Sequence, residues 1–264
     1  MRSPGPHAGA VYSWGRCKPG RSWAPLSRGA ACVAWAGGVQ SLAMSTLKHG
    51  HPWRVTPAEA MAIQERLRGL VVREGSLAEV RRVAGLDVGF RGGVARAAVV
   101  VVSYPELELQ ARAVAERPVE FPYVPGLLTF REGPAALDAL SRLAAEWDVL
   151  LCDGQGIAHP RRLGLASHLG VLLDRPSVGC AKSRLVGSYA EPGEAAGSWT
   201  ELVDGGEVVG AAVRTRSGAK PVFVSVGHRV SLPEAIALVL GCTRGRRLPE
   251  PARLAHRLAS GGEH

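Results

Sequence analysis

The chain contains 264 residues, of which 46% are hydrophobic and 21% charged, with 33 glycines, 18 prolines and 5% aromatic residues. This composition can bury one sizeable core, and it excludes fibrous and wholly disordered chains. No stretch reaches the roughly 18 uninterrupted apolar residues that a membrane-spanning helix needs. We therefore expect a soluble protein with one folded domain and no membrane partner.

The net charge of +9 is concentrated near the N-terminus. Residues 1–58 carry seven basic side chains and no acidic one, which leaves 25 basic and 23 acidic residues, a net charge of +2, for the remainder. A near-neutral body has little long-range field to attract phosphate, so binding of nucleic acid must depend on local basic clusters.

The cysteines indicate a reducing compartment. The five residues are widely separated, and no pair has the spacing of a zinc or redox site; they are Cys17, Cys32, Cys152, Cys180 and Cys242. We expect free, buried thiols and a cytoplasmic protein.

Residues 1–53 are predicted to lie outside the fold, because they lack acidic residues and show no sustained period. Three interpretations compete for this segment: a targeting peptide, a basic arm, and a start codon assigned too early. We favour the last, with Met44 as the first residue, and expect the folded domain over residues 54–264.

The first predicted helix begins at a capping box, Thr56-Pro57-Ala58-Glu59, with proline at the first helical position. An apolar stripe with helical spacing follows at Ile63, Leu67, Leu70 and Val71. Residues 83–90 and 97–104 are predicted strands, and the run of four valines from residue 99 indicates that the second is buried on both faces. Residues 112–119 predict a weaker third strand.

The middle of the chain alternates between helices and strands. A helical period runs from Pro134 to Trp147, a short strand follows at 148–152, Leu165 to Leu172 form a helix, and residues 177–180 form a strand. This order predicts an α/β fold with a partly parallel sheet. Beyond a surface loop at 189–198 we expect a hairpin of residues 207–215 and 221–226, then a helix from the capping box Ser231–Glu234 to Leu240.

Two aspartates occupy positions where ligands bind in α/β proteins. Asp87 lies in or ends the first strand, and Asp153 ends Val-Leu-Leu-Cys. A carboxylate there is costly to desolvate unless it meets a cation or a helix N-terminus, and two on neighbouring strands can share Mg²⁺. The structural alternative is an Asp that caps a turn before glycine.

Other motifs leave alternatives open. The glycines at 154 and 156 do not complete a dinucleotide fingerprint, and neither a phosphate-binding P-loop nor a serine-hydrolase elbow occurs. Arg161 and Arg162, near His159 and His168, suit either a phosphate site or a solvated loop. Tyr123 lies between two prolines, where an aromatic ring serves as a wedge between stacked bases or as a packed loop anchor.

Six blocks of sequence together resemble the endonuclease V family, the deoxyinosine-directed DNA repair nucleases. They follow the family's order over roughly residues 54–257 and lie at 83–90, 121–132, 153–168, 178–185, 227–231 and 248–256. The resemblance implies a fold similar to ribonuclease H, with helices on both faces of a mixed central sheet.

The resemblance also implies roles for individual residues. Asp87 and Asp153 match the Mg²⁺-binding aspartates, for which Mn²⁺ can substitute, and the other active-site matches are Glu132, Lys182 and His256. Tyr123 matches the wedge tyrosine. A lesion pocket is expected to be lined by Gly126, Leu128, Gly154, Gly156, Gly164 and Leu165.

The function implied is that of a monomeric, Mg²⁺-dependent DNA repair endonuclease. It would bind DNA that contains deoxyinosine and hydrolyse the second phosphodiester bond 3′ to the lesion. Two alternatives are an inosine-specific endoribonuclease, since some relatives prefer RNA, and a lesion-binding protein that does not cleave.

Overall fold

The computed structural model describes residues 47–262, so Met44, Cys17, Cys32 and the rest of residues 1–46 lie outside the described residues. Within this range, no helix is long and apolar enough to cross a membrane. One mixed sheet contains eight strands in the order β3-β2-β1-β4-β5-β8-β7-β6. The pairs β1/β4 and β4/β5 are parallel, and the other neighbours are antiparallel.

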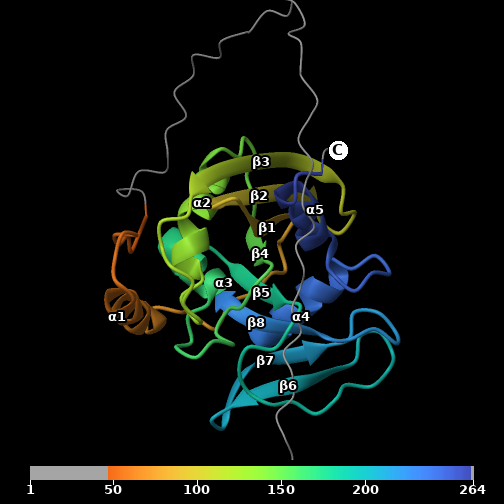
Figure 1. The fold of residues 1–264 in the computed structure, drawn as a ribbon. Coiled ribbons are helices and arrows are strands. Elements are labelled where there is room, and N and C mark those ends of the chain that lie inside the picture. Colours follow the sequence, from red (N-terminus) through yellow and green to blue (C-terminus); the bar gives the residue numbers. More distant parts are fainter. Residues whose placement is uncertain (1–46, 263–264) are drawn as a thin grey trace, which may run out of the picture. The chain divides into compact units, whose positions relative to one another are not determined.

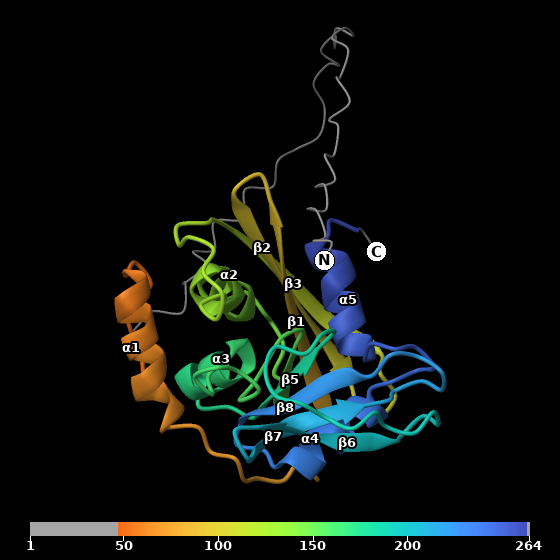
Figure 2. The same cartoon turned by 60° about the horizontal axis from the view of Figure 1, so that its bottom comes forward.

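The strands are β1 Arg82–Arg91, β2 Val94–Ser103, β3 Leu109–Pro118, β4 Val149–Cys152, β5 Ser177–Ala181, β6 Trp199–Asp204, β7 Glu207–Val213 and β8 Val222–His228. The helices are α1 Pro57–Arg68, α2 Thr129–Ser141, α3 Leu165–Leu173, α4 Leu232–Gly241 and α5 Glu250–Ala259. The expected fold class is confirmed, because helices cover both faces of the sheet: α2 and α3 one face, α4 and α5 the other (Figures 1 and 2).

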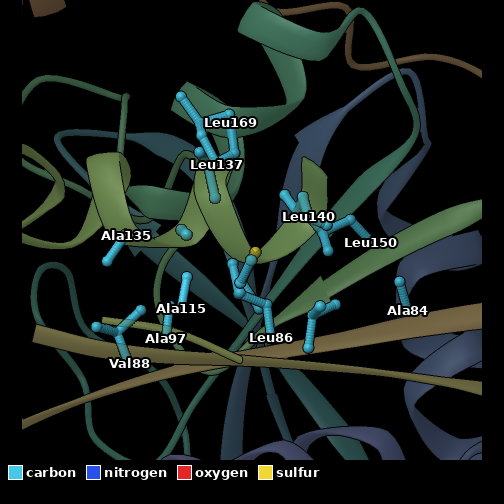
Figure 3. Close-up of a cluster of buried hydrophobic side chains, with 14 of the residues drawn as sticks. Ala84, Leu86, Val88, Ala97, Ala115, Ala135, Leu137, Leu140, Leu150 and Leu169 are labelled. Atoms are coloured by element: carbon cyan, nitrogen blue, oxygen red, sulfur yellow. The ribbon is translucent and has the colours of Figure 1, made fainter. Parts of the chain in front are cut away.

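Side chains alternate between two cores along the strands. Leu86 of β1 and Leu150 of β4 pack under Leu137 and Leu140 of α2 and Leu169 of α3 (Figure 3). Val83 of β1 and Val149 and Leu151 of β4 point to the opposite face, where they belong to a second core with Ile236 and Val239 of α4. The predicted burial of the valine run on both faces of β2 is confirmed. Cys152, Cys180 and Cys242 are free and buried, as expected.

Residues 47–53, which we expected in the extension, pack on the folded domain. Leu47 is buried in the core below α2 and α3. Nδ1–H of His51 donates to the carbonyl of Pro52 at 2.9 Å, so its Nε2 accepts the Nε2–H of His168 at 2.7 Å. The two rings lie among Trp53 and Phe130.

Some predicted boundaries are wrong. Helix α2 begins at Thr129, ahead of Pro134, and ends at Ser141; its first turn is held by the N–H groups of residues 130–132, so the proline follows a turn that has already formed.

The second capping box is only half formed. Ser231 accepts a hydrogen bond from the N–H of Glu234, but the carboxylate of Glu234 accepts from the N–H of Leu77. Strand β6 and helix α5 were not predicted.

Candidate active site

Three of the predicted site residues meet because their strands are parallel neighbours. Asp87 lies within β1, directly after the residues that pair with β4, while Asp153 and Lys182 directly follow β4 and β5. The carboxyl ends of parallel strands lie at one edge of a sheet, where α/β proteins bind ligands. Nζ of Lys182 lies 2.5 Å from Oδ2 of Asp153. The sequence prediction of two aspartates on neighbouring strands agrees with the structure; Asp87 lies inside its strand, and Asp153 ends its strand.

Helix α5 supplies His256 because β1 has glycines on the face below it. Residues 85, 87 and 89 share that face, since side chains alternate along a strand. A Cβ on Gly85 would lie 2.4 Å from the backbone of Pro251, and one on Gly89 would lie 3.3 Å from the carbonyl of Ala259. The helix therefore lies directly on the strand, and Nδ1–H of His256 donates to Oδ2 of Asp87 at 2.7 Å.

Glu132 completes the acidic centre, by which we mean Asp87, Glu132, Asp153, Lys182 and His256. It lies in the first turn of α2 and is only 7% exposed. Burial, followed by the negative charges of Asp87 and Asp153, raises the pKa of Glu132 well above its usual value. Burial also raises the pKa of Asp153, although Lys182 opposes this shift. The centre thus gathers more negative charge than one lysine neutralises.

These residues fit a divalent cation. One donor atom each from Asp87, Asp153 and His256 lies within 4.8 Å of the others. Oδ2 of Asp153 is buried and makes no hydrogen bond of ordinary geometry, since its contact with Lys182 is close but not aligned as one. Two carboxylates with an imidazole suit hard or borderline divalent ions, which would offset the crowded negative charge.

A pocket of about 360 Å³ shares a wall with the acidic centre. Glu132, Asp153 and Lys182 line one part of it, and the loop that follows β3 lines another. Five of the six glycine and leucine residues expected around a lesion pocket line it: Gly126, Leu128, Gly154, Gly164 and Leu165. Gly156 does not, because its backbone packs against β8, where a Cβ would lie 2.0 Å from the carbonyl oxygen of Val226.

Tyr123 lies at the rim of this pocket and is 71% exposed. Its ring faces the guanidinium of Arg131 at 5.9 Å, and the same guanidinium lies 5.0 Å from the ring of Phe90. The tyrosine is therefore not buried as a loop anchor.

The loop after β3, which lines the pocket, is held by side-chain hydrogen bonds that the sequence did not predict. The carbonyl of Gly126 accepts hydrogen bonds from Gln64 at 3.1 Å, His159 at 3.0 Å and Arg161 at 2.7 Å. Gln64 is fully buried and also accepts from Nε of Arg161 at 2.5 Å. Because Gly126 has a φ of 77°, a conformation that favours glycine, these bonds hold it in a shape few other residues adopt.

The nearby basic and histidine side chains are occupied by internal contacts. Arg161 belongs to this network, and Arg162 pairs with Asp204 and Glu207. Burial lowers the pKa of His159 to about 4, and His168 is buried against His51. For the two arginines, the structure favours the structural alternative over a phosphate site.

Comparison with known proteins identifies the family. The sequence model described as Endonuclease V matches residues 65–257. A curated relative named Endonuclease V from Roseiflexus sp. (strain RS-1) is 55% identical over 211 residues, which cover 80% of this chain and 95% of the relative.

Solved structures agree with the sequence comparison. The endonuclease V of Streptomyces avermitilis is 47% identical, with a TM-score of 0.76 over 79% of this chain and 93% of that one. The Ciona intestinalis endonuclease V, solved with a DNA that contains an inosine followed by a ribo-adenosine, is 33% identical, with a TM-score of 0.69 over 78% and 98%. The chain therefore belongs to the endonuclease V family, whose members are nucleases that hydrolyse phosphodiester bonds.

Proposed function

We propose that this protein is a Mg²⁺-dependent endonuclease that recognises deoxyinosine in DNA and hydrolyses the second phosphodiester bond 3′ to the lesion. The observation that carries the proposal is the shared wall between the pocket and the acidic centre, at Glu132, Asp153 and Lys182. A base that leaves the stack and enters the pocket brings its own strand to the acidic centre. Base recognition and hydrolysis of the strand are thereby coupled.

The pocket suits a flipped purine read by backbone groups. Hypoxanthine has an acceptor at O6 and a donor at N1, and it lacks the 2-amino group of guanine, so hydrogen bonds to its edge distinguish it from both adenine and guanine. Gly126 and Gly154 allow the backbone to approach closely, and the bonds from Gln64, His159 and Arg161 fix the loop at Gly126. Exposed Tyr123 at the rim fits a wedge that fills the space the base leaves.

The acidic centre supplies the groups for hydrolysis. Asp87 and Asp153 would hold the cation, which when bound supplies Lewis-acid stabilisation of phosphoryl oxygens and lowers the pKa of water. Lys182 presents a fixed positive charge where negative charge develops on the phosphoryl oxygens. Because Nδ1–H of His256 is donated to Asp87, Nε2 is the ring nitrogen left to act on the departing 3′ oxygen; as an imidazolium, His256 would give that oxygen the proton on Nε2 and become neutral. Glu132 lies on the wall that the centre shares with the pocket, and we assign it the orientation of the attacking water.

The test is strand cleavage of matched duplexes that carry one deoxyinosine or one inosine ribonucleotide, with Mg²⁺ and with EDTA. We expect metal-dependent nicking 3′ to deoxyinosine. Asp87→Asn should lower the rate at least about 100-fold while lesion binding persists, because it removes an anionic ligand without changing side-chain size. Glu106→Gln, in the exposed turn between β2 and β3, is the matched control and should cut normally.

The other outcomes separate the alternatives. Cleavage only at the inosine ribonucleotide would assign the protein to RNA. Tight lesion binding without cleavage in any metal would assign it a sensing role, against which stands the presence of all five residues of the acidic centre. An unchanged rate in Asp87→Asn would overturn the metal assignment.

A further inference from the structure

A groove outside the pocket and the acidic centre runs between α5 and the sheet. It has a volume of about 1130 Å³ and is lined by Gly89 and Arg91 of β1, by residues of β2 and β3, and by residues 258–262 at the end of α5. Figure 2 shows α5 beside this part of the sheet. We call it the arginine groove, after Arg91, Arg96 and Arg112, which line it.

The charge of the groove suits an anionic chain. Glu116 is the one acidic residue in its lining, and it pairs with Arg96, whose Nε also donates to the carbonyl of Leu258 at 3.3 Å. Arg91 and Arg112 are exposed and form no ion pair with any of residues 47–262. Two unpaired guanidinium groups in a groove match phosphate oxygens, which arginine binds through two parallel hydrogen bonds.

The groove lies next to the acidic centre along β1. Gly89 is two residues beyond Asp87 on the same face of β1, and Arg91 is four residues beyond, at roughly 13 Å for the rise of a strand. In a duplex, successive phosphates of one strand advance about 3.4 Å along the axis. Arg91 therefore lies within reach of a phosphate about four base steps from the cleaved bond.

The direction of the bound strand follows from the order of the three sites. The pocket adjoins Asp153, Asp87 adjoins Asp153, and the groove adjoins Asp87 through β1 and α5. If the lesion fills the pocket and the bond cleaved lies 3′ to it, the strand continues 3′ into the groove. We propose that the arginine groove binds the phosphodiester backbone on the 3′ side of the cleaved bond, an inference that rests on the proposed function.

The test compares two deoxyinosine duplexes with the same 5′ flank. One ends about three base pairs beyond the cleaved bond, and the other extends about ten further. Affinity is measured in EDTA over a range of salt concentrations for the full chain and for Arg91→Ala/Arg112→Ala. The wild-type protein should bind the longer duplex more tightly, and the double variant should lose that difference. Its salt slope on the longer duplex should fall by about 2, one for each phosphate contact.

Two further variants keep the result specific. Arg112→Lys in the wild-type background keeps the charge and should retain the flank dependence. Arg81→Ala removes one exposed arginine at the opposite end of β1 and should change neither the flank dependence nor its salt slope.

Flank dependence that survives in the double variant would overturn the groove assignment. Cleavage of both duplexes by the wild-type protein with Mg²⁺ is measured separately. A wild-type protein that leaves both uncut would overturn the proposed activity, while the binding comparison would still decide the groove.

Discussion

Among single residues, Glu132 is the one whose ionisation most directly opposes folding of the acidic centre. It is nearly buried beside two other carboxylates, and these surroundings raise its pKa. An acid whose pKa is higher in the folded than in the unfolded protein contributes most to the free energy of unfolding while it is protonated. That contribution is lost as pH rises from the unfolded pKa, about 4.3, through the raised folded value. The ionised carboxylate therefore destabilises the metal-free protein at alkaline pH.

Glu132→Gln should consequently raise stability and lower activity. The amide has the same shape and no charge, so in EDTA at pH 8 we expect the free energy of unfolding to increase by about 2 kcal/mol, with little change near pH 4. Urea unfolding at the two pH values measures the difference, and cleavage with Mg²⁺ should fall. A variant no more stable than the wild-type protein at pH 8 would contradict this account of the acidic centre.

At the scale of elements, the contact between β1 and α5 sets the position of His256. Gly85→Ala would place a methyl group 2.4 Å from the backbone of Pro251, so α5 must move away from the strand. We expect kcat to fall at least about 100-fold, with a loss of stability of about 1–3 kcal/mol, because the hydrogen bond between His256 and Asp87 depends on that approach.

Gly89→Ala is a milder substitution on the same face of β1 and serves as the comparison for Gly85→Ala. Its Cβ would meet Ala259 at 3.3 Å, a contact that a small shift relieves, so its loss of kcat should be smaller. Equal kcat for Gly85→Ala and the wild-type protein would show that the spacing between strand and helix is not critical.

The elements that could be predicted from the sequence are those whose pattern is local. The valines of β2 and the capping box at Thr56, which forms in full, are signals contained in a few residues. Strand β6 lacks such a signal because it lies at the edge of the sheet and only Leu202 in it is buried.

The residues of the site also differ in whether a local sequence pattern predicts them. Asp87 and Asp153 could be predicted from apolar runs that end in a carboxylate. Lys182 and His256 followed only from the family resemblance. Gln64 contacts carbonyls 62 and 99 residues away, and no periodicity in α1 encodes those distances.

For the whole molecule, buried histidines predict a loss of stability in mild acid. Burial lowers the pKa values of His51, His159 and His168. A histidine with a lowered folded-state pKa contributes stability that is present above its unfolded pKa, about 6.5, and lost as pH falls below it, by at most about 1.4 kcal/mol per pH unit for each group. The raised pKa values of Glu132 and Asp153 act in the opposite direction, so a variant is needed to isolate the histidines.

His168→Gln should reduce the loss of stability between pH 7.5 and pH 5.5 by about 1 kcal/mol, since it removes one buried group that must be charged on unfolding. Urea unfolding at the two pH values checks this. His49→Gln changes a histidine that is not among the three and should leave the loss unchanged. An identical pH dependence in His168→Gln would exclude the buried pair with His51 as its source.

The hydrogen bond between Asp87 and His256 joins residues 169 positions apart. A chain growing on the ribosome therefore contains both aspartates and Lys182 long before it contains α5. Until that helix has been synthesised and packs on β1, His256 is absent from the acidic centre. The arginine groove also lacks the residues that the end of α5 contributes to its lining. The acidic centre thus reaches its full set of side chains only when nearly all of the described chain has been synthesised.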